Sequence, residues 1–474
     1  MPPRVCWLLL PLLLAALLAP AGTVAAATPA APIPPPRLPA ADRLYLGETG
    51  HVVQGGFLTL WRAGGAAVFG YPLTEEFDDV CDGRPCTVQY FERARFEYDP
   101  ASGRVALGAL GREATAGRSF PTEAPFPSGP DRWYFPETGQ ALGFGFLHYW
   151  LTNDGPRRLG LPISPELSEE GRTVQYFERG RLDYFVDREP AASVAVAPLG
   201  RAAVERRGWP LPATVELALS AEMVPQGRPL AIAVRGAREA SAALAGAPAP
   251  LQAAGGAWRG LAGIAPWAET GERLLTVTAT AADGTPRRLE RAVRVVPYDF
   301  PRERFQVPPG QGDLLSPEVR ERELATVQPL YAIMTPEPLW RGAWRWPATG
   351  PITTEFATRR AYNDGPYNEY HGGLDIAAPL GAPVVAPAAG RVVYAGPLAI
   401  RGNFIAIDHG LGLLSTYFHL SAIEVAAGER VEPGQRIGRV GSTGLSSGPH
   451  LHWETRIGGT PVEPRAWLTS DLLP

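Results

Sequence analysis

The segment His450-Leu-His-Trp-Glu-Thr-Arg456 has the aromatic and β-branched content of a β-strand. Residues two apart on a strand point to the same face and lie roughly 6.5 to 7 Å from each other. His450 and His452 can therefore reach one cavity without both binding the same ion. One of them can serve as a metal ligand while the other acts on a water molecule.

Further histidines precede this strand. Five of the seven histidines in the 474-residue chain lie in its last hundred or so residues. A catalytic zinc ion takes three nitrogen or oxygen ligands from protein and leaves a fourth position open. His371, Asp375 in His371-Gly-Gly-Leu-Asp375, and one histidine of the later pair supply that set. His419, which ends a second candidate strand, and the remaining histidine can move protons and stabilise an oxyanion.

Each part of this pattern has a simpler explanation when taken alone. A His-x-x-x-Asp spacing arises by chance among surface or turn residues, and a His-x-His pair can be two solvent-facing strand histidines. Together, with glycine-rich segments around all three parts and few histidines elsewhere, they predict a metal site that holds one Zn²⁺ per chain.

The motifs around these residues extend over about a quarter of the chain. They are His371-Gly-Gly-Leu-Asp-Ile-Ala-Ala-Pro379, Gly381-Ala-Pro-Val-Val-Ala-Pro-Ala-Ala-Gly390, Gly402-Asn-Phe-Ile-Ala-Ile-Asp-His-Gly410, Tyr417-Phe-His-Leu420, Gly434-Gln-Arg-Ile-Gly438 and Gly441-Ser-Thr-Gly-Leu-Ser-Ser-Gly-Pro-His-Leu-His452. The region from about Trp346 to Trp467 thereby resembles the lysostaphin, LytM and β-lytic zinc endopeptidases, which cut peptidoglycan peptides.

This resemblance implies roles for five residues. His371, Asp375 and His452 would be the zinc ligands, and His419 and His450 the catalytic pair, with peptidoglycan peptides as the substrate. Some relatives have lost ligands and act as regulators or binding modules. All five positions are filled here, so we expect an active metallo-endopeptidase. The alternative is a non-catalytic envelope-binding or amidase-regulating protein on the same fold.

Two details near the first ligand differ from the family pattern or leave alternatives open. The family often has Phe-Gly where this chain has Phe356-Ala357, which argues against a positive φ at that turn. Members commonly use a tyrosine near the first ligand to assist the transition state. Tyr362, Tyr367 and Tyr370 are the candidates, and ordinary loop packing is the alternative for each.

The other histidines carry no predicted chemistry. His409 is expected to be a turn residue that is hydrogen-bonded to backbone. His51 and His148 lie in the N-terminal half, beside no residue that would suggest a site.

The beginning of the chain indicates export. A basic start, the apolar run Trp7–Leu18 and the small residues Ala25-Ala-Ala27 predict a signal peptide over residues 1–27, cleaved after Ala27. The run is too short for a standard membrane-spanning helix, so a permanent anchor is the less favoured alternative. We expect a secreted or cell-envelope location. After cleavage, only Cys81 and Cys86 remain, and they predict one local disulfide.

Composition predicts a mainly β, multidomain protein. The 53 glycines and 51 prolines favour turns and short strands, and 45% hydrophobic residues suffice for several cores. The net charge is −4, and the sequence contains no lysine, so all 44 basic residues are arginines. They are scattered among acidic residues, which argues against a nucleic-acid partner. The sequence leaves the oligomeric state open.

A proline-rich linker, residues 28–41, leads into two similar segments. Val88-Gln-Tyr-Phe-Glu-Arg93 returns as Val174-Gln-Tyr-Phe-Glu-Arg179, one of several matches with a period of roughly 86 to 90 residues. We expect repeat units at 42–118 and 131–207, which loosely resemble LGFP-type envelope repeats. Trp61 and Trp150 could bind wall or glycan, or could simply form the cores of the two units.

The remaining residues divide into three parts. Alternating segments between 209 and 297 predict an immunoglobulin-like β-sandwich that acts as a spacer. Residues 298–345 form a partly helical connector, with Ser316 as the helix N-cap and an end by Pro329. This connector could steer or cover the active-site groove. Residues 346–474 are the predicted zinc peptidase domain, built on an antiparallel sheet.

Overall fold

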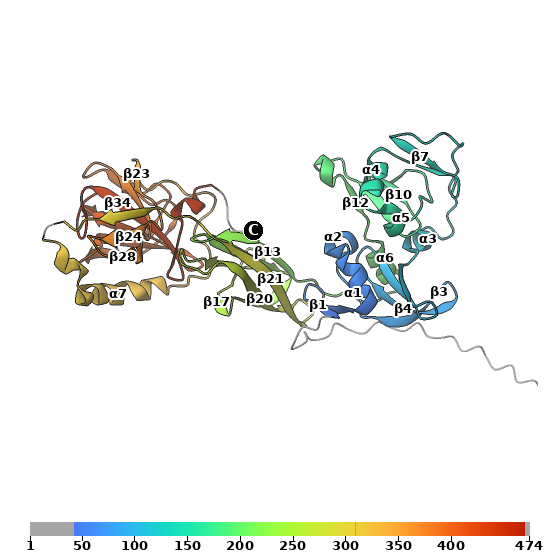
Figure 1. Ribbon diagram of the computed structural model, residues 1–474, viewed down its shortest axis with the longest axis horizontal. Coiled ribbons are helices and arrows are strands. Elements are labelled where there is room, and N and C mark those ends of the chain that lie inside the picture. Colours follow the sequence, from blue (N-terminus) through green and yellow to red (C-terminus); the bar gives the residue numbers. More distant parts are fainter. Residues whose placement is uncertain (1–41, 309, 470–474) are drawn as a thin grey trace, which may run out of the picture.

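The computed structural model describes residues 42–308 and 310–469. The predicted signal peptide and the linker at 28–41 lie outside the described residues. The prediction of a mainly β protein with several domains is confirmed, since most elements are strands arranged in separate sheets (Figure 1). Within the described ranges, none of the helices has the length and apolar character needed to cross a membrane.

The two N-terminal units follow the same order of elements: a hairpin, two helices, a four-stranded sheet and a closing helix. The first unit contains β1 (Arg43–Leu46), β2 (His51–Gln54), α1 (Gly55–Arg62), α2 (Gly65–Phe69), β3 (Phe77–Cys81), β4 (Arg84–Tyr90), β5 (Arg95–Asp99), β6 (Arg104–Leu107) and α3 (Leu110–Ala114). The second contains β7 (Arg132–Phe135), β8 (Gln140–Gly143), α4 (Phe144–Thr152), α5 (Gly155–Arg158), β9 (Leu167–Glu169), β10 (Arg172–Tyr176), β11 (Arg181–Tyr184), the 3₁₀ turn Pro190–Ala192, β12 (Val194–Val196) and α6 (Leu199–Arg206).

The closing helices tie these units together. On α3, the Arg112 N–H donates to the Glu178 carbonyl of the second unit over 3.1 Å. On α6, the Arg201 N–H donates to the Glu92 carbonyl of the first unit over 3.0 Å. A Cβ at Gly200 would lie only 1.9 Å from the Phe91 carbonyl oxygen, so the close approach requires glycine. We call the two units together the N-terminal pair, because each depends on the other for packing.

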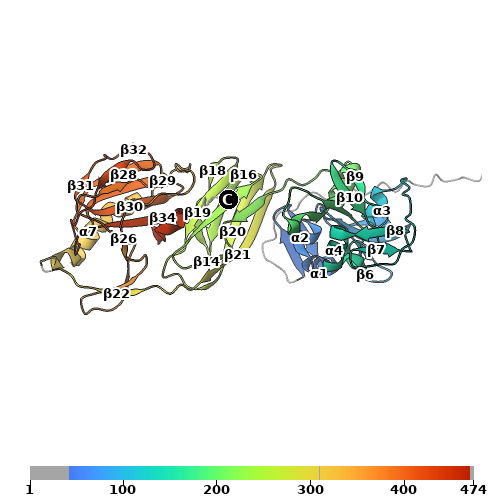
Figure 2. The same cartoon turned by 90° about the horizontal axis from the view of Figure 1, so that it is seen from above.

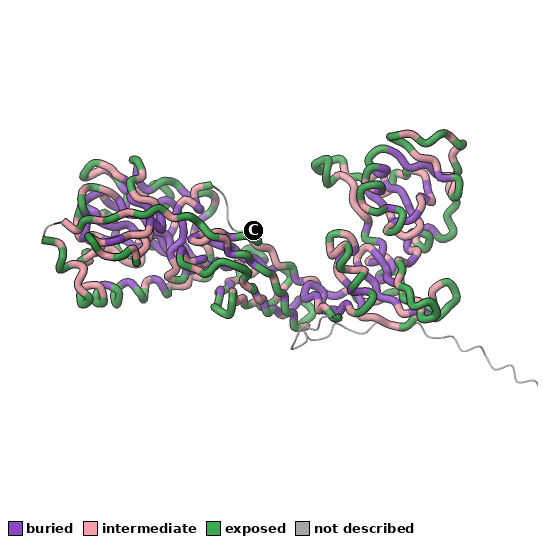
Figure 3. The backbone as a smooth tube through the Cα atoms, viewed as in Figure 1, coloured by how far each residue is buried: buried purple, intermediate pink, exposed green. Residues whose placement is uncertain are grey.

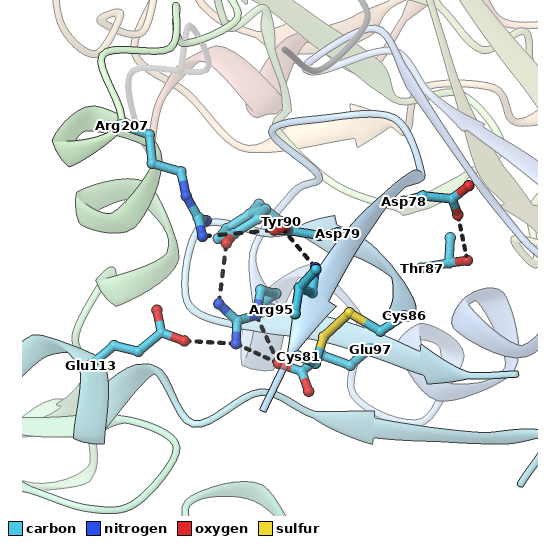
Figure 4. Close-up of a disulfide and its surroundings, with 11 residues drawn as sticks. Asp78, Asp79, Cys81, Cys86, Thr87, Tyr90, Arg95, Glu97, Glu113 and Arg207 are labelled. Carbon is cyan, nitrogen blue, oxygen red and sulfur yellow. Dashed lines mark hydrogen bonds and ion pairs between the residues drawn. A yellow bond between two sulfur atoms is a disulfide. The ribbon is translucent and has the colours of Figure 1, made fainter. Parts of the chain in front are cut away.

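The first unit contains a disulfide in the β3–β4 hairpin. Cys81 and Cys86 are joined with a Cα–Cα distance of 5.8 Å. Figure 4 shows Arg95 nearby, donating to the carboxylates of Glu97 and Glu113. The second unit has no cysteine at the matching hairpin, so the disulfide is a local feature of the first unit.

Residues 213–296 form two packed sheets. The strands are β13 (Glu216–Leu219), β14 (Met223–Pro225), β15 (Pro229–Arg235), β16 (Ala237–Leu244), β17 (Ala247–Ala249), β18 (Gln252–Ala254), β19 (Ala257–Gly263), β20 (Gly271–Ala281) and β21 (Pro286–Val296). One sheet has the order β13-β15-β19-β18 and the other the order β14-β21-β20-β16-β17. Their inner faces share one apolar core, to which Leu230, Ile232, Val277 and Val293 contribute fully buried side chains. We call this part the sandwich.

The C-terminal domain is built on an eight-stranded sheet. Before it come β22 (Arg302–Phe305), the 3₁₀ turn Gly312–Leu315 and α7 (Pro317–Tyr331). The domain then contains β23 (Ile352–Thr354), β24 (Arg359–Tyr362), β25 (Glu369–Tyr370), β26 (Leu374–Ala377), β27 (Pro383–Val385), β28 (Gly390–Leu398), β29 (Gly402–Gly410), β30 (Leu413–Leu420), β31 (Ala422–Ile423), β32 (Arg430–Val431), β33 (Arg436–Arg439), β34 (His450–Ile457), β35 (Thr460–Val462) and the 3₁₀ turn Pro464–Trp467. The main sheet runs β23-β26-β34-β30-β29-β28-β32, and β35 pairs with β34.

Helix α7 begins as predicted but ends later. The Ser316 side chain accepts the Val319 N–H over 3.4 Å, as an N-cap does. The prediction that the helix ends by Pro329 is wrong, because it continues to Tyr331. A proline in the last turn removes only one backbone hydrogen bond, and the Tyr331 side chain is buried against the C-terminal domain.

The three parts lie in a row and are joined by direct contacts (Figure 2). The Val215 N–H of the sandwich donates to the Glu48 carbonyl of the N-terminal pair over 2.8 Å. At the other end, Ala231 and Leu261 of the sandwich belong to the apolar core of the C-terminal domain. Figure 3 shows buried residues running through the C-terminal domain to this joint. The domain that carries the predicted site is therefore packed against its neighbour.

Candidate metal centre

Neighbouring strands bring the predicted site residues together. Strands β26, β34 and β30 lie side by side, with Asp375 directly opposite His452 and His452 opposite Phe418, the residue before His419. Along β34, Leu451 and Trp453 are fully buried in the core. Alternation therefore places His450 and His452 on the opposite face of the sheet.

His371 reaches the same face from the segment that precedes β26. Its N–H donates to the Thr358 carbonyl over 2.9 Å, and its own carbonyl accepts the Ala357 N–H over 2.8 Å. Ala357 is fully buried and has a φ of 57°. The expectation that this turn avoids a positive φ is therefore wrong, because these hydrogen bonds hold alanine in a left-handed conformation.

Three donor atoms converge. The His371 Nε2 atom lies 3.0 Å from the Asp375 Oδ1 atom and 2.9 Å from the His452 Nδ1 atom, and the last two atoms are 2.8 Å apart. All three side chains are buried. Two imidazoles and a carboxylate that face one point make a donor set that suits zinc.

The second ring nitrogen of His371 and that of His452 each hydrogen-bond to a group outside the three-donor cluster. The His371 Nδ1–H donates to the Glu355 carbonyl over 3.0 Å, and the His452 Nε2–H donates to the Glu454 carboxylate over 3.2 Å. A carbonyl oxygen only accepts, so the His371 proton resides on Nδ1 and its Nε2 offers a lone pair. Such outer partners orient metal-binding imidazoles.

The electrostatics of the three donors favour a cation. Burial raises the pKa of Asp375, but His371 and His452 outweigh it, and the pKa lies well below its usual value. Burial lowers the pKa of His452, but the carboxylates of Asp375 and Glu454 outweigh it and raise the pKa. The acceptor atoms thus require positive charge between them, which a proton or a metal ion can supply. The residues present fit a zinc ion.

Two further imidazoles stand beside this cluster. The rings of His419 and His450 have centroids 4.9 Å apart. The His419 Nδ1–H donates to the Thr443 carbonyl and the His450 Nδ1–H to the Gly448 carbonyl, each over 2.8 Å. The Nε2 atom of His450 lies 3.7 Å from the Asp375 Oδ1 atom. Burial and the neighbouring histidines lower the pKa of His419 to about 3, so this imidazole is neutral at neutral pH.

A groove of about 580 Å³ opens over these residues. Its lining comes from the sheet, from the loop before β34 and from the connector; it comprises Glu303, Arg304, Phe305, Gln306, Thr353, Thr354, Arg360, Asp375, Ala377, His419, Leu445, Ser447, Gly448, Pro449, His450 and His452. Polar and apolar side chains are mixed along it.

Comparison with known proteins agrees with this geometry. Residues 369–464 match Peptidase family M23. The C-terminal domain belongs to peptidase family M23.

Relatives of the M23 domain have two kinds of name. The chain is 50% identical over 94 residues to the DD-carboxypeptidase/endopeptidase Mpg of Neisseria meningitidis, which covers 20% of this chain and 22% of that protein. It is 39% identical over 126 residues to the peptidoglycan DD-endopeptidase ShyA of Vibrio cholerae, covering 26% and 29%. It is also 41% identical over 128 residues to the murein hydrolase activator NlpD of Salmonella typhimurium, covering 27% and 31%. The chain thus spans less than a third of the length of these relatives.

The three candidate tyrosines pack around the M23 domain groove without lining it, as far as the described residues show. Tyr362 packs edge to face on Phe305, and burial raises its pKa. The Arg304 guanidinium lies over the Tyr367 ring, and the Tyr370 ring lies 5.6 Å from that of Trp267. These contacts correspond to the packing alternative for each tyrosine.

Several residues near the M23 domain centre were missed by the sequence reasoning. Glu454 holds His452 and in turn accepts the Arg456 Nε–H over 2.8 Å. The same two-residue spacing that links His450 to His452 leads to Glu454, so this signal was present. Arg360 lies 3.7 Å from Asp375 and pairs with Glu303 of β22. Glu303 belongs to the connector and lines the groove. No sequence motif in the connector pointed to this residue.

The remaining histidines lie apart from the centre. His409 is fully buried, and it donates from Nδ1 to the Ala389 carbonyl over 2.8 Å and accepts at Nε2 from the Ser415 hydroxyl over 2.7 Å. His51 is buried with Nδ1 3.1 Å from Glu75, and His148 is exposed on α4. His409 therefore has a packing role in the M23 domain.

Proposed function

We propose that this protein is an exported zinc metallo-endopeptidase that hydrolyses peptide bonds in bacterial peptidoglycan. The observation that carries the proposal is the pairing of a three-donor cluster with two imidazoles that each use Nδ1–H for a backbone carbonyl and leave Nε2 without a hydrogen bond among the described residues. Ligands alone would suit a structural metal site, but His419 and His450 are the groups that hydrolysis needs.

The mechanism follows from which atom of each imidazole is free. A zinc ion held by His371, Asp375 and His452 would supply the positive charge that acidifies a water molecule and polarises a carbonyl. In both His450 and His419 the Nδ1–H donates to a backbone carbonyl, so Nε2 is the ring atom left for proton transfer. One of them takes the proton of the attacking water. Once protonated, an Nε2–H can stabilise the oxyanion or pass its proton to the leaving amine.

The groove and the relatives support the substrate. A polypeptide segment with several polar groups fits a groove of mixed lining better than a small apolar molecule does. One relative is named a peptidoglycan DD-endopeptidase and another a DD-carboxypeptidase/endopeptidase. The predicted signal peptide would deliver the chain to the envelope, and the N-terminal pair would target or space the M23 domain there.

A second candidate function is activation of another wall hydrolase. The similarity to the murein hydrolase activator NlpD favours it. It does not require free Nε2 atoms over a three-donor cluster, so the geometry favours the peptidase.

Turnover of purified peptidoglycan separates the two functions. We expect the mature chain to release soluble peptide fragments, to lose this activity on chelation and to regain it when Zn²⁺ is added. Mass spectrometry of the fragments identifies the bond. His148→Ala, an exposed histidine far from the groove, is the control and should behave as the wild type. If the chain releases nothing alone but increases the activity of an added amidase, the activator function is correct and the peptidase proposal is wrong.

A further inference from the structure

Helix α7 is a part of the catalytic domain that lies outside the family match. It ends at Tyr331, whereas the match begins at residue 369. Its buried residues are Glu323, Val327 and Tyr331, which are four apart and so share one face. Val327 and Tyr331 pack into a cluster with Phe404, Ala406, Leu414 and Phe418. Figure 1 shows α7 running along the domain beside β28.

Glu323 is the polar residue on that buried face. Its side chain is 2% exposed. It accepts the Ile400 N–H over 2.6 Å and forms an ion pair with the Arg401 guanidinium. Both partners lie in the turn before β29. A buried carboxylate with two such partners fixes the position of the turn, since moving either partner would leave a buried charge unpaired.

The Ile400–Arg401 turn also holds the backbone of His419. The His419 N–H donates to the Arg401 carbonyl over 2.8 Å. On the other side, the His419 carbonyl accepts the Thr443 N–H over 3.3 Å. His419 has a φ of 61°, a left-handed conformation that is unfavourable for a residue with a side chain. Such a conformation persists only where the surroundings impose it.

We propose that Glu323 is a positioning residue for His419. It anchors Ile400 and Arg401, and the Arg401 carbonyl keeps His419 in the conformation that directs its imidazole into the groove. The Arg401 guanidinium also lies over the Phe418 ring, 5.1 Å from its centre, which ties the same turn to the residue before His419. The inference rests on the proposed peptidase function. It gives the connector helix a supporting role on the M23 domain, distinct from the groove wall formed by β22.

Kinetics of Glu323→Gln in the full mature chain test this inference. Glutamine keeps the size and can still accept the Ile400 N–H, but it loses the charge that pairs with Arg401. We expect kcat to fall about 10- to 100-fold, as when the outer partners of metal-site ligands are removed, with KM and the zinc content unchanged. Glu321→Gln, an exposed change on the same helix, is the matched control and should leave kcat unchanged.

Val327→Ala separates positioning from simple loss of stability. It weakens the packing of α7 but leaves the Glu323–Arg401 pair in place, so the melting temperature should fall while kcat stays within twofold of wild type. Arg401→Gln should lower kcat as Glu323→Gln does, and the double variant should lose little more. The inference is wrong if Glu323→Gln keeps the wild-type kcat. It is also wrong if Val327→Ala has the same melting temperature as Glu323→Gln and loses as much kcat.

A spectroscopic measurement on His419 tests the inference even if the protein has no peptidase activity. With ¹⁵N-labelled histidine, the His419 imidazole signals can be assigned by their loss in His419→Ala. They should move in Glu323→Gln and stay in place in Val327→Ala. If the wild type has no peptidase activity, the proposed function fails, and these signals alone decide whether Glu323 positions His419. Unmoved signals in Glu323→Gln would overturn the inference.

Discussion

The N-terminal pair and the M23 domain both bury polar side chains, but they satisfy them in opposite ways. Gln89 and the matching Gln175 are fully buried. The Gln89 amide donates to the Val52 and Thr74 carbonyls over 2.8 and 2.9 Å, and the Gln175 amide does the same to Ala141 and Ser164. In the M23 domain, His371, Asp375 and His452 direct acceptor atoms at one another.

This contrast distinguishes buried polar groups that stabilise the fold from buried polar groups that form a binding or catalytic site. Each of these buried glutamine amides donates to two backbone carbonyls and so stabilises the fold without a further ligand, although its own Oε1 atom accepts no hydrogen bond. Buried acceptors that face each other raise the energy of the fold unless positive charge joins them. We therefore expect changes in the N-terminal pair to affect stability alone and changes around the M23 centre to affect chemistry first.

The largest effect should come from removing a free imidazole. His450→Ala should lower kcat about 10²- to 10⁴-fold, because a general acid–base group is lost, while the zinc content stays at one ion per chain. Turnover of peptidoglycan and metal analysis of the purified protein measure the two quantities. Asp375→Ala, in contrast, should lose the metal as well. A His450→Ala chain that works at the wild-type rate would remove His450 from the mechanism.

In the N-terminal pair, Gln89→Leu should cost stability but no activity. Two backbone carbonyls lose their donor, and each unsatisfied buried group costs roughly 1 to 3 kcal/mol. We expect the free energy of unfolding of this part to fall by that order in a denaturant titration. Cleavage of a soluble peptide by the M23 domain should be unchanged. A loss of peptide cleavage would show that the two parts are coupled and would break the comparison.

A third test uses His409, a buried M23 histidine with a hydrogen bond at each ring nitrogen. Burial lowers its pKa to about 4, below the value of 6.5 in the unfolded chain. The unfolded state therefore binds the proton more readily, and the domain should lose up to about 3 kcal/mol as the pH falls from 6.5 to 4. Stability is unaffected by this group above pH 6.5.

His409→Gln should flatten that pH dependence, as measured by denaturant unfolding at several pH values. The burial of His419 acts in the same direction, but it is present in both proteins and cancels in the difference. Identical pH slopes in the two proteins would contradict the assignment.

The smallest effect concerns a strained position in the N-terminal pair. Phe144 is the first residue of α4 and has a φ of 47°, where α1 of the first unit begins at Gly55 with a φ of 54°. The Phe144 side chain is largely exposed, so it contributes little packing. Phe144→Gly should raise the free energy of unfolding by about 1 kcal/mol. The reverse change, Gly55→Phe, should lower it, and peptidase activity should be unchanged in both.

Much of the site followed from spacing along single strands. Two-residue alternation on β34 separates His450 and His452 from the core residues Leu451 and Trp453, and the short loop to Asp375 keeps the first ligand near. These are local relations, which sequence patterns carry well.

Relations between distant segments were not predictable in the same way. The Glu303–Arg360 pair and the Glu323–Arg401 pair join residues far apart in sequence, and each residue alone has an ordinary charged surface pattern. The closing helices α3 and α6 fall within the predicted repeat bounds 42–118 and 131–207, but their backbone contacts cross to the other unit. Ala357 shows the limit for backbone conformation, because tertiary hydrogen bonds outweigh its preference against a positive φ.

The contacts between the three parts of the molecule also limit how far the M23 domain can move relative to the N-terminal pair. A flexible linker lets a domain explore a volume whose radius grows with the square root of the linker length. Here the Glu48 carbonyl binds the sandwich, and Ala231 and Leu261 extend the M23 core into it. Packing of this kind fixes the distance and the orientation between the N-terminal pair and the groove. A molecule held by the N-terminal pair would therefore meet the groove in one geometry.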